Sequence, residues 1–95
     1  MADNQIIGKH KTKVFKKEGY TCVQYWNTIV LKFNEKEIIL DSGGYRTATT
    51  KLRINQASQE FNLGLNVSQK NFIWYVNFKG NTLEFRDNMK IVSYN

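Results

Sequence analysis

The chain has 95 residues, which is enough for one domain with a modest core and too few for a second domain. Hydrophobic residues make up 41% of it and aromatic residues 14%, and this content excludes a disordered chain. The formal net charge of +6 favours an anionic partner, such as nucleic acid, a nucleotide or an acidic protein, although many small basic domains carry such charge for solubility alone.

Cysteine content and hydropathy indicate the compartment. Cys22 is the only cysteine, so the chain cannot form an internal disulfide, and we expect a reducing environment. Residues 1–8 lack the apolar run of a signal peptide, and no apolar segment has the length that spans a bilayer. We therefore expect a cytoplasmic protein with no membrane partner.

The chain before residue 41 has the pattern of strands. Residues 1–11 are polar and include His10 between two lysines, so we expect a flexible N-terminal arm ahead of a single domain over residues 12–95. Apolar, β-branched and aromatic residues then alternate with turn residues. The strand-like runs lie around Val14 and Phe15 and over residues 20–26, 29–33 and 37–40.

The segment 41–64 contains the only convincing helix. Gly43 and Gly44 allow a sharp bend out of the preceding strand, and Thr47 is the expected N-cap, with Thr49 as the alternative. We expect Gly64 to end the helix in the left-handed conformation. The stripe that would dock the helix on a sheet consists of Thr50, Ile54, Ala57 and Phe61.

Strand-like runs return after the helix over residues 65–69, 72–78, 82–86 and 89–92. The run 72–78 is bulky on both faces and is expected to be central. We predict an α+β protein, in which one central helix covers an antiparallel sheet or partial barrel, with the order β-β-β-α-β-β-β.

The start of the helix has the composition of an anion site. Helix N-termini present unpaired amides and the positive end of the helix dipole, and nearby cations add fixed charge. The segment lacks the Gly-x-x-x-x-Gly-Lys-Ser/Thr pattern of a P-loop. A purely structural alternative is that the glycines form a tight turn, the threonines cap the helix and the lysine is solvated. The candidate phosphate-binding residues are Gly43, Gly44, Arg46, Thr47, Thr49, Thr50 and Lys51.

Aromatic residues on the strands offer a second mode of binding, because exposed rings beside lysines stack on unpaired bases. We expect Trp26 and Trp74 to pack in the core of so small a domain. Two amide side chains one turn apart on the outward helix face are spaced for contacts with adenine. The candidates for stacking or polar contact are therefore Tyr25, Tyr75, Asn55 and Gln59.

Catalysis has little support in the sequence. His10 lies in the arm, Cys22 lies in a strand, and no cluster of His, Cys and Asp has the spacing of metal ligands. Asp41 beside Ser42 has no partner in the sequence that would act as a base. We expect no enzyme, no metal site and no cofactor.

Three segments carry a resemblance to a known group of proteins. They read LDSGGYRTATTK over residues 40–51, NQAS over residues 55–58 and WYV over residues 74–76. In these segments the chain resembles small uncharacterised proteins of bacteriophages and marine viral metagenomes. The resemblance implies a viral setting, in the cytoplasm of an infected bacterial host, and it brings no activity or site residues.

Two functions of different kinds fit these observations. The first is a non-enzymatic binding protein that holds nucleic acid or a nucleotide through phosphate contacts. The second is a protein-interaction or structural module, which forms a homo-oligomer through a sheet edge or its outward aromatic residues, or counteracts a host defence by binding a host or phage protein.

Overall fold

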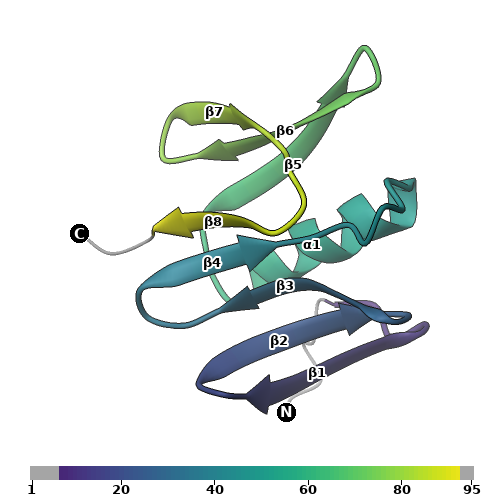
Figure 1. Ribbon diagram of the computed structural model, residues 1–95, viewed down its shortest axis with the longest axis vertical. Helices are drawn as coiled ribbons and strands as arrows, with labels where there is room; N and C mark the ends of the chain where they lie inside the picture. The colour runs from purple at the N-terminus through teal and green to yellow at the C-terminus, as the bar shows by residue number, and fades with distance from the viewer. Residues whose placement is uncertain (1–6, 93–95) are drawn as a thin grey trace.

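The computed structural model describes residues 7–92 and shows one helix between two groups of strands (Figure 1). The α+β class is confirmed, but each group has four strands rather than the predicted three. All eight strand-like runs of the sequence form strands, so the predicted order left out one run on each side of the helix. The lysine-rich β1 and the short β7 lie at sheet edges, where pairing of the backbone on one side is enough to form a strand. The elements are β1 (Thr12–Lys17), β2 (Tyr20–Tyr25), β3 (Thr28–Phe33), β4 (Glu37–Leu40), α1 (Ala48–Glu60), β5 (Leu65–Lys70), β6 (Ile73–Phe78), β7 (Asn81–Glu84) and β8 (Met89–Val92).

The strands form two antiparallel sheets in place of a single sheet. Five strands pair in the order β1-β2-β3-β4-β8, and three pair in the order β5-β6-β7, and neither sheet closes into a barrel. The last strand crosses back to pair with β4, so that Glu37 lies opposite Val92 and Leu40 lies opposite Met89. This long-range pairing ties the C-terminal segment to the N-terminal meander.

The two ends of α1 follow from local chemistry. Thr47 is the N-cap, as predicted, and its hydroxyl accepts a hydrogen bond from the Thr50 amide. Gly64 has the predicted left-handed conformation, with φ of 79°, but the predicted stop there is wrong, because the helix ends at Glu60 and Asn62 takes the left-handed position of the cap with φ of 56°. The amides of Asn62 and Leu63 donate back to carbonyls of the last turn, so that a Schellman-type cap is complete before Gly64.

The core lies between α1 and the two sheets. Ile54 and Ala57 of the predicted stripe are fully buried, and the Phe61 ring lies 5.0 Å from the Phe33 ring. At the other end of the core, the rings of Trp74 and Phe85 meet edge to face at 5.3 Å. The expectation that Trp74 packs inside is therefore confirmed.

Side chains of α1 satisfy the free edge of the three-stranded sheet. The Asn55 side-chain amide donates to the carbonyl of Val67 at 3.0 Å, and its oxygen accepts from the Val67 amide at 2.7 Å. The Ser58 hydroxyl makes the same pair of contacts with Leu65, at 2.7 and 3.0 Å. These two residues occupy the hydrogen-bonding positions that another strand would fill.

The described part of the N-terminal segment packs against α1. Ile7 is buried in the core, and the Gly8 amide donates to the Gln56 side-chain oxygen at 3.0 Å. The same oxygen accepts from the guanidinium of Arg53, which is itself buried. Residues 1–6 of the expected arm lie outside the described residues.

Replacing Asn55 tests the edge contact. We expect Asn55→Ala to lower the free energy of unfolding by about 2 kcal/mol, because it leaves the amide and carbonyl of Val67 without partners in a partly buried site. Gln59→Ala, one turn further on an exposed position, is the matched control and should change stability by only a few tenths of a kcal/mol. Equal urea midpoints for the two variants would contradict the structural role of Asn55.

The turn between β5 and β6 supplies a second test. Asn71 and Phe72 both have positive φ, at 54° and 68°, and the Phe72 side chain is 94% exposed. An aromatic residue in this conformation is strained by about 1 to 2 kcal/mol, and glycine is not, although glycine gains entropy in the unfolded chain. We expect Phe72→Gly to raise the stability by about 0.5 to 1 kcal/mol in urea unfolding, whereas Asn71→Gly, at a residue that tolerates this conformation, should have a smaller effect.

Candidate functional site

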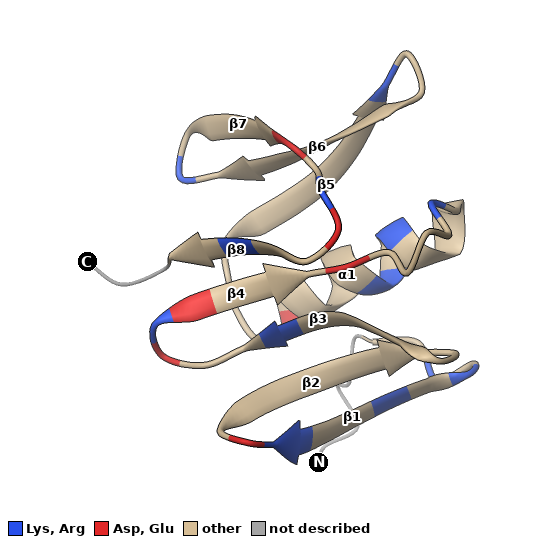
Figure 2. Ribbon diagram, in the orientation of Figure 1, with Lys and Arg blue, Asp and Glu red and all other residues tan. Residues whose placement is uncertain are grey.

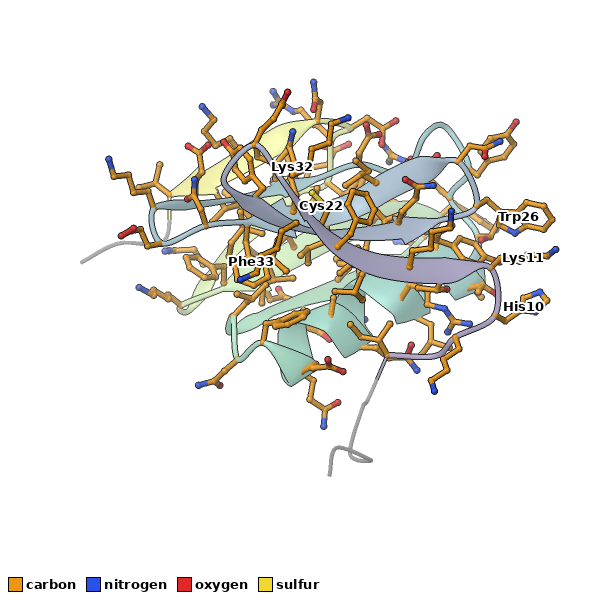
Figure 3. The ribbon with its side chains drawn as sticks, turned by 90° about the horizontal axis from the view of Figure 1, so that it is seen from below. His10, Lys11, Cys22, Trp26, Lys32 and Phe33 are labelled. Carbon is orange, nitrogen blue, oxygen red and sulfur yellow. The ribbon has the colours of Figure 1, made fainter. Side chains whose placement is uncertain are left out.

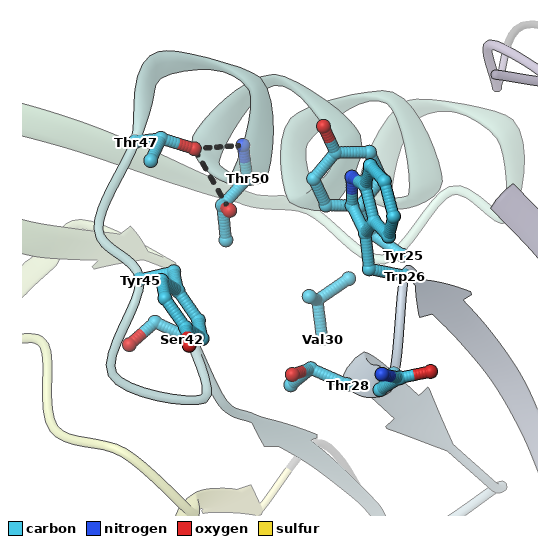
Figure 4. A pocket seen from close by; sticks show the side chains of 9 residues that line it. Tyr25, Trp26, Thr28, Val30, Ser42, Tyr45, Thr47 and Thr50 are labelled. Atoms are coloured by element: carbon cyan, nitrogen blue, oxygen red, sulfur yellow. Dashed lines mark hydrogen bonds between the residues drawn. The ribbon is translucent and has the colours of Figure 1, made fainter. Parts of the chain in front are cut away.

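A surface pocket of about 310 Å³ lies between the turn that joins β2 to β3 and the segment that leads into α1 (Figure 4). Three aromatic rings and several hydroxyl groups face it. The lining residues are Tyr25, Trp26, Asn27, Thr28, Val30, Ser42, Tyr45, Thr47 and Thr50.

The ring of Trp26 is the most unusual feature of the pocket. The expectation that it packs in the core is wrong, because Trp26 lies in a two-residue turn and its side chain is 56% exposed. The residue has a φ of 55°, a rare conformation for a bulky side chain. Its amide donates to the carbonyl of Lys11 at 2.8 Å, and the Lys11 ammonium lies 4.9 Å from the ring centre.

Tyr45 and Tyr25 supply the other rings. Tyr45 is 71% exposed and projects from the segment before the helix, while Tyr25 ends β2 and is half-buried. The guanidinium of the buried Arg53 lies 5.6 Å from the centre of the Tyr25 ring. A planar molecule in the pocket would therefore contact aromatic carbon, with fixed positive charge near two of the rings.

The polar side of the pocket consists of hydroxyl groups. Thr50 is buried, and its hydroxyl lies 3.0 Å from that of Thr47, which also caps the helix. Ser42 is buried at the opposite side and is held by Asp87. The hydroxyls of Thr47 and Thr50 can exchange hydrogen bonds with a ligand, whereas the Ser42 hydroxyl already donates to the Asp87 carboxylate beside the pocket.

A small network fixes the loop that carries Ser42 and Tyr45. The Asp87 carboxylate accepts from the Ser42 amide at 2.8 Å and from its hydroxyl at 2.6 Å. A Cβ atom at Gly43 would collide with the Thr28 hydroxyl, and Gly43 has a φ of 64°, so only glycine fits where this loop passes β3. Hydrogen bonds to Asp87 and close packing of Gly43 against Thr28 therefore hold the loop in place.

The pKa of Asp87 follows from the same contacts. Partial burial opposes its charge, but the two hydrogen bonds from Ser42 and the nearby guanidinium of Arg46 outweigh this effect, so the pKa of Asp87 lies below its ordinary value of 3.8. The carboxylate is therefore charged at neutral pH and keeps both hydrogen bonds.

The structure divides the predicted phosphate-binding residues into three groups. Thr47 and Thr50 line the pocket, and Thr49 is half-buried in the first turn of α1 outside the lining. The amides of Gly43 and Gly44 already donate to the side chains of Asp41 and Ser42. The cations of the group, Arg46 and Lys51, lie over the edge of the core, at 5.9 and 6.0 Å from the centre of the Trp74 ring.

The residues predicted for stacking or polar contact are also separated. Tyr25 lines the pocket, and Tyr75 is half-buried on β6, outside the lining. Both polar ends of the Asn55 amide are bonded to β5, while Gln59 is exposed on α1. Sequence analysis missed Trp26 and Tyr45, and a signal for Trp26 was its position beside Asn27, since a turn there places both side chains at the surface.

The described residues offer no group of three His, Cys, Asp or Glu side chains placed to hold a metal ion. Cys22 is buried in β2, and His10 is exposed. Over residues 7–92, the single helix is too short and too polar to cross a membrane.

The fold and the pocket define a small, basic α+β protein with a ring-lined surface site. A family model described as Kyanoviridae Gp96 protein matches residues 1–92, so the chain belongs to this family of cyanophage proteins. The match confirms the phage setting that residues 40–51 and their neighbours implied, and its description names no activity. Comparisons with curated proteins and with solved structures give no match.

Asp87 is the residue through which the pocket loop can be tested. We expect Asp87→Asn to cost about 1 kcal/mol of unfolding free energy near pH 7, at the low end for a charged acceptor because the site is open to solvent. Since the folded-state pKa of Asp87 is lowered, its contribution is present above the ordinary pKa of 3.8 and is lost as the pH falls through the folded value.

Urea unfolding of wild type and Asp87→Asn at pH 7 and near pH 3 measures this difference. The gap between the two proteins should narrow at the lower pH. Glu35→Gln, which removes an exposed carboxylate in the turn between β3 and β4, is the control and should show no such gap. A constant gap at both pH values would show that the Asp87 charge does not hold the loop.

Proposed function

We propose that this protein is a non-enzymatic binding protein for nucleic acid or a nucleotide, and that the pocket receives a nucleobase. The observation that carries the proposal is the convergence of Tyr25, Trp26 and Tyr45 on one pocket. Aromatic side chains stack on any base, and exposed rings held by the backbone are suited to this. The volume of about 310 Å³ is at the lower end of small-molecule sites, which fits a base better than an intact larger ligand.

Hydroxyl groups and cations around the pocket would orient a bound nucleotide. Thr47 and Thr50 can bond the polar edge of a base or a ribose hydroxyl, and the helix N-terminus behind them favours negative charge. Because the amides of Gly43 and Gly44 are occupied, phosphate contact falls to side-chain cations. These are Lys11, whose ammonium lies 4.9 Å from the centre of the Trp26 ring, and Arg46, whose chain neighbours Tyr45 and Thr47 line the pocket. This revises the phosphate site from backbone amides toward side-chain charge.

The family setting suggests what such binding is for. A cyanophage protein that binds nucleic acid can coat or handle it in the cytoplasm of the infected cell, and one that binds a free nucleotide can remove a signalling molecule of host defence. The net charge of +6 supports either role by attracting phosphorylated ligands.

Intrinsic fluorescence provides a direct test, because Trp74 is buried and Trp26 is exposed in the pocket. Nucleoside monophosphates and a short single-stranded oligonucleotide should quench the Trp26 emission on binding. We expect Trp26→Ala to weaken binding by about 5- to 150-fold, the range that corresponds to about 1 to 3 kcal/mol for one stacked base. Calorimetry gives the affinity of this variant, whose emission no longer reports the pocket.

Phe72→Ala removes an exposed ring at a distant hairpin turn and is the matched control, with no expected loss of affinity. Binding that is unchanged in Trp26→Ala would contradict the proposed site. Absence of binding at low salt for every nucleotide and oligonucleotide would reject the function itself.

The alternative function is a protein-interaction module, and one observation favours it. Phe72 at 94% exposure and Ile73 at 40% place apolar surface at the tip of the β5–β6 hairpin. Size-exclusion chromatography with light scattering distinguishes the two: a stable oligomer that is lost in Phe72→Ala, without affinity for nucleotides, would support this alternative.

A further inference from the structure

One face of the five-stranded sheet has no described element packed over it. Side chains alternate across a strand, and Val23 and Leu31 point toward α1 and the core, so their neighbours Cys22 and Lys32 point away. Figure 3 shows Cys22 and Lys32 on the side of the sheet opposite the helix. We call this surface the open face; its main side chains are Lys13, Phe15, Lys17, Tyr20, Lys32 and Lys90.

Figure 2 shows basic residues along β1, β3 and β8. The strand register places several of them on the open face, which is therefore strongly basic. Among the described residues of β1, β3 and β8, it carries four lysines, against the single carboxylate of Glu37 on β4. That carboxylate is engaged, since it accepts a hydrogen bond from the Tyr20 hydroxyl and lies 3.5 Å from the Lys90 ammonium. Besides the hydrogen bond from Tyr20, the charge of Lys32 also acts on Glu37 and helps to lower the pKa of that carboxyl. Among the four lysines of this face, Lys13 and Lys17 are therefore the two that do not share the Glu37 carboxylate.

Rings lie between these charges. The Lys32 ammonium is 4.8 Å from the centre of the Tyr20 ring, and Tyr20 is fixed by its bond to Glu37. Phe15 is half-buried on β1 opposite Cys22, one side-chain step from Lys13 and from Lys17 on the same face. A basic sheet surface with half-exposed rings offers both phosphate contacts and stacking positions.

The open face is also continuous with the pocket. The Gln24 side chain, which lies opposite Lys13, donates to the Trp26 carbonyl at 2.9 Å, and the Lys11 ammonium covers the Trp26 ring. In Figure 3, Trp26 and Lys11 project together from one end of the sheet. A chain of phosphates that crosses the lysines can reach this end and deliver a base to the pocket.

We propose that the open face binds an extended single strand of nucleic acid, one base of which enters the pocket. This inference rests on the proposed function, because it takes the pocket as a nucleobase site and identifies its ligand. A second copy of this chain does not fit, since two open faces would bring lysines together. Stacking on Phe15 and Tyr20 requires unpaired bases, which a duplex does not offer.

The experiment compares a mononucleotide with a single strand of about 12 nucleotides, a length within the usual range for such sites. We expect the oligonucleotide to bind tighter and with stronger salt dependence. For a single strand, each phosphate contact adds about −0.7 to the slope of log affinity against log salt concentration. The variant Lys13→Gln with Lys17→Gln should therefore make the slope shallower by about 1.4, while mononucleotide binding stays unchanged.

Two matched controls separate position from charge. Lys70→Gln with Lys79→Gln removes the same charge from the three-stranded sheet, and Lys16→Gln removes one charge from the other side of β1. Neither should change the slope by more than a few tenths. Thermal unfolding confirms that each variant is folded, which is expected because all of these side chains are exposed.

The remaining outcomes separate this inference from the proposed function. If the oligonucleotide binds no tighter than the mononucleotide, and both still depend on Trp26, the open face is not part of the site and the pocket stands alone. Duplex binding equal to that of the single strand would overturn the inference as well. If neither ligand binds, both proposals fail together.

Discussion

The fold depends on the contact between α1 and β5. Within residues 7–92, no strand of one sheet pairs with a strand of the other, and the side chains of Asn55 and Ser58 supply the bonds that a neighbouring strand would otherwise make. Unpaired backbone groups at this partly buried edge would cost more than the bonds themselves contribute, so these two residues fix where the three-stranded sheet sits on the helix. Ile54 and Ala57, the neighbours of Asn55 and Ser58 in the helix, are buried in a core that includes residues of both sheets, and α1 also contacts β2 and β3. One helix thereby orients both sheets.

The pocket is a consequence of that arrangement. Its walls come from the turn at Trp26, the loop at Ser42 and the first turn of α1, which meet only because the helix is held at both sheets. Asp87, which lies in the connection between β7 and β8, accepts hydrogen bonds from the amide and hydroxyl of Ser42 and so holds the loop that carries Ser42. Residues from three distant parts of the sequence, at positions 25–30, 42–50 and 87, therefore shape the pocket.

Sequence analysis succeeded where the determining interaction is local. Thr47 caps the helix through an amide three residues away, and a threonine after two glycines is enough to predict this. It failed where the interaction is distant: nothing near Asn55 reveals that its amide is bonded to Val67, and the pairing of β4 with β8 spans half the chain. The same limit applies to the pocket. Tyr25 was predicted as a ring on a strand, but its position near the start of the helix depends on tertiary contacts, which local sequence patterns do not show.

Trp26 shows how the fold prepares a ring for binding. Its left-handed backbone is held by the bond from its amide to the Lys11 carbonyl, which extends the pairing of β1 with β2 past the end of the strands. The strain of this conformation is therefore offset by sheet pairing and not by contacts of the ring, which stays 56% exposed. The backbone that carries the ring is therefore already ordered before a ligand stacks on it, and this part of the ordering cost does not reduce affinity. Phe72 has a similar conformation and even greater exposure, but its turn lies away from the pocket lining and from the lysines of the open face. Trp26 differs in combining an exposed ring on a fixed backbone with an adjacent cation, Lys11, and a place in the pocket lining.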